Sequence, residues 1–125
     1  NANASNNMGR FDGAYNVVKR DCKGSGKYIY RCNDLQMELS NHENVRKVLE
    51  LDANGFSIRY TDMSHPFVDN FLKDGIVFKK VTPQGEVWMW EFYNEGTEIK
   101  YHQYIEIKDK EGLHWTDSIY TLSPR

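Results

Sequence analysis

The stretch VWMWEFYNEGTEIKYHQYIEIK, residues 87–108, decides the fold that we expect for this chain. Trp88, Trp90 and Phe92 occupy every second position, and the same alternation of apolar and polar residues resumes after Asn94-Glu95-Gly96. A period of two with one polar face is typical of a half-buried antiparallel strand. A glycine in the connection can adopt the left-handed conformation that a tight reversal needs. The stretch therefore predicts a β-hairpin with one buried face.

The same theme repeats along the chain from Phe11 onward. Short runs rich in β-branched and aromatic residues end in glycine-containing turns, a pattern that is typical of antiparallel hairpins. We expect eight strands in an up-and-down meander, or nine if the polar break at residues 41–44 separates two strands. The expected strands are 11–19, 27–32, 35–39 with a bend to 45–51, 56–61, 76–81, 87–93, 97–107 and 113–122.

One segment has a helical period. Phe67, Val68, Phe71 and Leu72 recur at the spacing of one helix face, which predicts a short helix at about residues 65–73. A helix of about two turns is not stable alone in water, so we expect its apolar stripe to rest on the sheet.

The apolar face of the sheet has two ways to avoid water. Eight or nine short antiparallel strands can close into a barrel or pack as two sheets of a sandwich. Because the connections are short, we predict an all-β, up-and-down barrel, with a β-sandwich as the alternative. Residues 9–125 should form a single domain, since this length suffices for one core. The polar residues 1–8 should form a disordered tail.

Composition argues against two classes of protein. The chain has 16 Lys and Arg against 18 Asp and Glu, so it lacks the basic excess that nucleic-acid binding needs. Its apolar runs are far shorter than the roughly 20 residues of a membrane-spanning helix. Residues 1–8 are too polar for the core of a signal peptide, so we expect that any export signal has been removed or was never part of this sequence.

The two cysteines indicate a compartment. Cys22 and Cys32 enclose a loop of eleven residues, for which a disulfide would add about 3 kcal/mol of stability. Zinc is disfavoured because there is no Cys-x-x-Cys pair. We expect a disulfide, with two reduced thiols as the alternative, and a disulfide places the protein in the periplasm or outside the cell.

Two short motifs near the ends of the domain are similar to those of lipocalin-like (calycin) barrels. Gly13-Ala14-Tyr15 resembles the Gly-x-Trp that opens the first strand of that family, with Tyr in place of Trp. Thr116-Asp117 followed by Tyr120 resembles a Thr-Asp-Tyr signature on a late strand, although no Tyr directly follows the Asp. The resemblance implies a cup for a small apolar ligand, with its mouth opposite Tyr15.

The sequence contains no strong catalytic motif. It has no nucleophile elbow, phosphate-binding glycine loop or His-Glu-x-x-His, so we predict neither an enzyme nor a cofactor or metal site. His65 with Asp62 and Asp69 is the tightest group of potential ligands, but the start of a helix with a capping carboxylate is the favoured interpretation.

An apolar ligand would contact the side chains that we expect to converge inside the sheet. Polar Gln103 and Asp117 occur in otherwise apolar rows, and a few polar groups among aromatic rings are typical of ligand pockets. The same residues could instead simply fill the core. The expected ligand-binding residues are Phe56, Tyr60, Trp88, Trp90, Tyr101, Gln103 and Trp115.

Two functions therefore compete. The first is a secreted or periplasmic lipocalin-like barrel that binds a small apolar molecule in its interior. The alternative is a non-enzymatic β module with a filled core that binds a protein or glycan through exposed tyrosines, a residue enriched at interfaces. Those tyrosines are Tyr28, Tyr30, Tyr93 and Tyr104. The interior volume separates the two functions, because a drug-sized ligand needs about 300 Å³ or more.

Overall fold

The computed structural model describes residues 11–33, 49–51, 55–58, 68–70 and 76–125. One antiparallel sheet and one short helix make up this part of the chain, which confirms the all-β prediction. The strands are β1 (Gly13–Gly24), β2 (Leu49–Leu51), β3 (Gly55–Ile58), β4 (Val68–Asn70), β5 (Ile76–Val81), β6 (Val87–Glu95), β7 (Glu98–Asp109) and β8 (Gly112–Pro124). The helix is η1, a 3₁₀ helix at Gly26–Asn33.

The sheet is open within the described ranges, so the predicted barrel is not confirmed. Hydrogen-bonded neighbours follow the order β2-β3-β1-β8-β7-β6-β5-β4, and the two ends of this order do not pair. The predicted meander holds from β4 to β8. It fails at β1, which pairs with β8 on one side and with β3 on the other.

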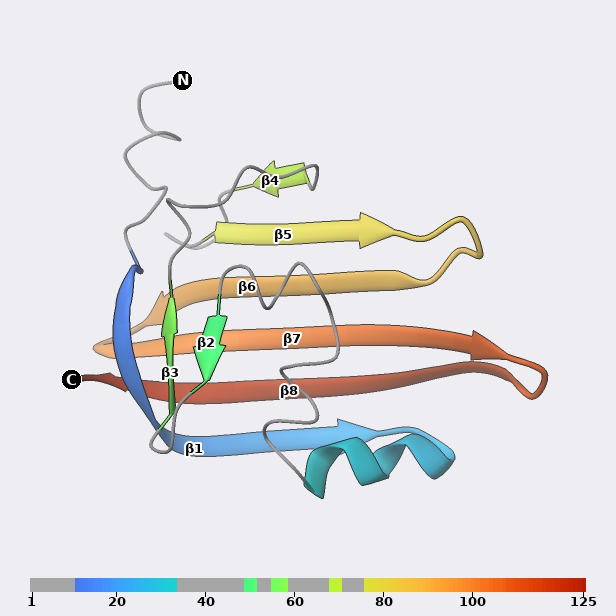
Figure 1. Ribbon diagram of the computed structural model, residues 1–125, viewed down its shortest axis with the longest axis horizontal. Coiled ribbons are helices and arrows are strands. Elements are labelled where there is room, and N and C mark those ends of the chain that lie inside the picture. Colours follow the sequence, from blue (N-terminus) through green and yellow to red (C-terminus); the bar gives the residue numbers. More distant parts are fainter. Residues whose placement is uncertain (1–10, 34–48, 52–54, 59–67, 71–75) are drawn as a thin grey trace.

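Strand β1 bends along its length: residues 13–16 pair with β3 and residues 15–24 pair with β8, so Tyr15 and Asn16 have both neighbours. Its pairing with β8 shifts register between Val17 and Lys19, which leaves Val18 as an extra residue, 67% exposed. Such a bulge bends a strand. Figure 1 shows the second part of β1 running alongside β8, whereas the first part rises with β3 across the ends of the long strands. Phe11 stacks on Phe92 of β6 with ring centroids 6.3 Å apart, so this end of the chain packs against the sheet.

The first part of β1 is held closely on both sides. On the β3 side, a side chain at Gly55 would overlap the carbonyl oxygen of Tyr15, so only glycine permits this approach. At the C-terminus, the Arg125 amide donates to the Ala14 carbonyl at 2.9 Å and its guanidinium donates to the Tyr15 carbonyl at 3.0 Å. Gly55 is the first residue of β3, one residue before the strand that the sequence predicts at 56–61.

One face of β6, β7 and β8 forms the core, here called the inner face. The rings of Phe92, Tyr101 and Tyr120 lie in one row across the three strands, with centroid separations of 4.7 and 5.4 Å. Stacked aromatic pairs add about 0.5–1.5 kcal/mol each beyond the burial of their area. The buried residues of the inner face are Trp90, Phe92, Tyr101, Gln103, Ile105, Thr116, Ser118, Tyr120 and Leu122.

Two sequence-based assignments are wrong. Residues 27–32 form η1 and not a strand, because the chain folds back at Gly24, whose Cα lies against the backbone of Ile29. Val68–Asn70 forms β4 and not part of a helix, because these residues hydrogen-bond to the edge of β5. The rest of the predicted 65–73 helix, residues 1–8 and residues 35–39 lie outside the described residues.

No helix in the described part of the chain has the length and apolar character needed to cross a membrane.

Candidate functional site

The inner face brings together three of the predicted ligand-binding residues. Trp90 lies opposite Gln103 in the β6–β7 register, and the Tyr101 hydroxyl donates to Gln103 Oε1 at 2.9 Å. Trp90 is 3% exposed, and Tyr101 and Gln103 are each 0% exposed. A cavity large enough for water would leave accessible surface on the residues that line it. These three residues therefore have almost no space beside them.

The other predicted ligand-binding residues do not join this group. Trp88 lies in the next row of the same face, is half-buried, and donates from Nε1 to the Glu106 carbonyl at 3.0 Å. Trp115 lies on the opposite face, because Thr116 and Ser118 are the β8 residues that point inward. Phe56 belongs to β3, but its side chain and all of Tyr60 lie outside the described residues.

Thr116 is a buried polar residue on the inner face. It is 1% exposed, and its hydroxyl has no hydrogen-bond partner in the described part of the chain. A buried hydroxyl without a partner costs about 1–3 kcal/mol of desolvation.

A charged network occupies the opposite face of the same three strands, here called the outer face. His102 Nδ1 lies 2.7 Å from Glu91 Oε1, and His102 Nε2 lies 2.5 Å from Asp117 Oδ1. Burial disfavours the charged ring, but the two carboxylates outweigh it and raise the pKa of His102. The sequence analysis expected Asp117 in an inward row, whereas the structure places it on the outer face.

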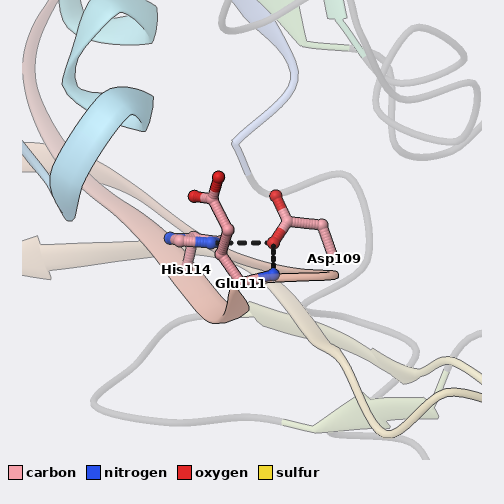
Figure 2. A group of neighbouring side chains, drawn as sticks. All are labelled: Asp109, Glu111 and His114. Carbon is pink, nitrogen blue, oxygen red and sulfur yellow. Dashed lines mark hydrogen bonds and ion pairs between the residues drawn. The ribbon is translucent and has the colours of Figure 1, made fainter.

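The third group lies at the β7–β8 turn, where η1 meets the end of the sheet. Figure 2 shows the His114 ring and the Glu111 amide both directed at Asp109 Oδ1, at 3.0 and 2.8 Å. Asp109 Oδ2 accepts a hydrogen bond from the Tyr28 hydroxyl at 3.0 Å and pairs with Lys27 Nζ at 3.2 Å. The Glu111 amide, together with these side chains, holds the pKa of Asp109 well below its usual range, although desolvation acts in the opposite direction. We call this group the Asp109 latch.

The Asp109 latch also contains metal-binding residue types. One ligand atom from each of Asp109, Glu111 and His114 can be chosen so that all three lie within 4.8 Å of one another. However, the Lys27 ammonium also lies 3.6 Å from Glu111 Oε2, so it already supplies a cation to both carboxylates. These hydrogen bonds and ion pairs therefore link η1 to the β7–β8 turn. The spacing Asp-x-Glu-x-x-His was visible in the sequence, but its partners on η1 were not.

Helix η1 presents the exposed aromatic surface at this end of the molecule. Ile29 and Tyr30 are each 49% exposed, and the Tyr30 ring lies 6.2 Å from that of Tyr28. Of the four tyrosines predicted to be exposed, Tyr30 is exposed and the other three are not, since Tyr28 is half-buried with its hydroxyl bonded to Asp109. Tyr93 is 9% exposed, and Tyr104 is half-buried with its hydroxyl bonded to Glu106 at 2.7 Å.

The predicted disulfide is confirmed and anchors η1. Cys22 of β1 is bonded to Cys32 near the end of η1, with their Cα atoms 5.5 Å apart. On the other side of η1, the Ser25 hydroxyl accepts from the Trp115 amide at 2.9 Å. The segment is therefore fixed to both β1 and β8.

Comparisons of the chain with protein-family models, curated proteins and solved structures give no match.

Proposed function

We propose that the protein is a non-enzymatic β module that binds a protein partner through the η1 surface, defined as Ile29, Tyr30 and the charged residues of the Asp109 latch. One contrast carries the proposal. Trp90, Tyr101 and Gln103 on the inner face are at most 3% exposed, whereas Ile29 and Tyr30 are half exposed. Among the residues that the structure describes, Tyr30 on η1 is thus the exposed aromatic side chain, which supports binding at this surface rather than on the inner face.

The chemistry of the η1 surface favours a protein over a glycan. An exposed aliphatic side chain beside a tyrosine, surrounded by residues of both charge signs, resembles the apolar centre and polar rim of protein interfaces. The disulfide, the Asp109 latch and the Ser25–Trp115 hydrogen bonds fix η1 before binding. Such preorganisation lowers the entropy cost of association.

The disulfide supports an oxidising compartment for this activity. Structural disulfides persist in the periplasm and outside the cell and are rare in the cytosol. We therefore propose that the protein acts as an exported module.

Site-specific photo-crosslinking tests the proposal. A photoreactive residue replaces Tyr30 on η1, and a matched variant carries it at Val81, which is 59% exposed at the β5–β6 turn. The Tyr30 position should give a discrete protein adduct that the Val81 position lacks. Tyr30→Ala should then weaken the affinity for that purified partner at least tenfold, as expected for an interface anchor. Equal adducts at both positions, or unchanged affinity, would refute the proposal. If the native protein binds a polysaccharide and Tyr30→Ala loses that binding, the partner is a glycan and not a protein.

A second candidate function is a lipocalin-like carrier of a small apolar molecule. The Thr116 hydroxyl favours it, because a ligand could supply the hydrogen bond that the described residues do not. Tyr15, which the resemblance compares with the family's opening aromatic residue, is buried, and its hydroxyl donates to the Phe11 carbonyl at 2.7 Å. Titration with fatty acids and small aromatic probes should then give saturable binding that Thr116→Val weakens. No binding across the panel would exclude this candidate.

A further inference from the structure

The outer-face network joins three strands through one imidazole ring. Glu91 lies on β6, His102 on β7 and Asp117 on β8, and each carboxylate contacts a different ring nitrogen. Ionised carboxylates only accept hydrogen bonds, so both ring nitrogens must carry a proton for both contacts to form. The geometry therefore requires the imidazolium form of His102.

The other polar side chains near His102 on β7 already have partners in the described ranges. Lys100 on the same strand is engaged with the Thr121 hydroxyl at 2.7 Å and with Glu98 at 3.4 Å, and Tyr104 is bonded to Glu106. The charged and titratable groups on this face near the ring are Glu91 and Tyr93 of β6, Lys100, Tyr104 and Glu106 of β7, Asp117 of β8, and Asp21 and Lys23 of β1. Lys23 lies opposite Asp117 in the β1–β8 register, so it is a cation near this carboxylate besides His102.

We propose that His102 is a pH-sensitive latch, which ties β6, β7 and β8 together while it is protonated and releases Asp117 when it loses a proton. A neutral ring has one N–H and can keep only one carboxylate. The side chain of Asp117 is 37% exposed and that of Glu91 is 13% exposed, so water can solvate Asp117 at the lower cost. The proton therefore stays on Nδ1 beside Glu91, and the Nε2 lone pair repels Asp117.

The direction of the stability change follows from linkage. The folded protein raises the pKa of His102 above its ordinary 6.5. The stabilisation is therefore complete below pH 6.5 and is lost as the pH rises through the folded pKa. The pH response of His102 does not depend on the proposed binding of a protein partner at η1.

Histidine side-chain NMR tests the latch directly. In the folded protein both His102 nitrogens should be protonated at pH 6.5, and the Nδ1–H tautomer should appear above the titration midpoint. Glu91→Gln and Asp117→Asn should each lower that midpoint. A midpoint at or below 6.5, an Nε2–H tautomer at high pH, or midpoints unchanged in both variants would overturn the proposal.

Thermal unfolding provides a second test that does not need those variants. The melting temperature of the native protein should fall between pH 6.5 and 9, and His102→Gln should flatten this dependence. His114→Gln, a matched change in the Asp109 latch, should retain it. If the melting temperature falls with pH equally in the native protein and in His102→Gln, the proposed role of His102 is also refuted.

Discussion

At the scale of single residues, the crossing of β1 and β3 depends on the absence of a side chain at Gly55. Gly55→Ala should lower the free energy of unfolding by about 2 kcal/mol or more, because the added Cβ would overlap the Tyr15 carbonyl and force the strands apart. Gly26→Ala is the control, since nothing lies within 4 Å of its added Cβ and only its φ of +49° is unfavourable, at about 1 kcal/mol. Urea denaturation of both variants measures the difference, and equal losses would contradict the close approach.

The inner face offers a second pair of substitutions at this scale. Gln103→Leu should cost about 1–3 kcal/mol, because it leaves the buried Tyr101 hydroxyl without its acceptor. Thr116→Val should leave stability unchanged or raise it, because it removes a hydroxyl that has no partner in the described residues. Urea midpoints check both, and a strongly destabilised Thr116→Val would show that its hydroxyl is bonded.

At the scale of elements, η1 is the part that sequence reasoning missed. Tyr28, Ile29 and Tyr30 suit a strand by composition, which is why a strand was expected at 27–32. Two contacts decide the outcome: the local close approach of Gly24 to Ile29, and the bonds from Lys27 and Tyr28 to Asp109, which is distant in the sequence. The faces of β6 and β7 were predictable, because alternation alone determines which side chains share a face.

The Asp109 latch predicts how η1 is held. Asp109→Asn should speed hydrogen exchange in η1 and lower the urea midpoint, because a neutral amide loses the ion pair with Lys27 and cannot accept all four contacts. Since the folded state lowers the pKa of Asp109, its contribution is present at neutral pH and disappears as the pH falls through the folded pKa. Glu111→Gln, whose side chain is 68% exposed, is the control. If Asp109→Asn leaves hydrogen exchange in η1 unchanged, Asp109 does not hold η1 in place.

The disulfide adds a covalent tie to the same element. Replacing both Cys22 and Cys32 by Ser should lower the free energy of unfolding by about 3 kcal/mol, the chain-entropy estimate for a loop of this size. Urea denaturation of the double variant, compared with the native protein under oxidising and reducing conditions, measures this loss. If the double variant is as stable as the oxidised protein, the disulfide does not stabilise the fold.

At the scale of the whole molecule, the strand order was harder to predict than the strands. Alternation assigns faces, and glycine turns correctly pair β5 with β6, β6 with β7 and β7 with β8. No local pattern says that β1 pairs with both β3 and β8, because such pairing depends on contacts between distant parts of the chain. Trp115 was misassigned for a similar reason, since the face of β8 is set by its register with β7.

The central claim is that the inner face is filled and does not hold a small molecule. A variant with Trp90 as its one tryptophan, made by Trp88→Phe and Trp115→Phe, reports on that face through its fluorescence. We predict a blue-shifted emission that iodide does not quench and that fatty acid does not change, because Trp90 is 3% exposed beside Gln103. Quenching by iodide, or a saturable spectral shift on adding fatty acid, would contradict the claim.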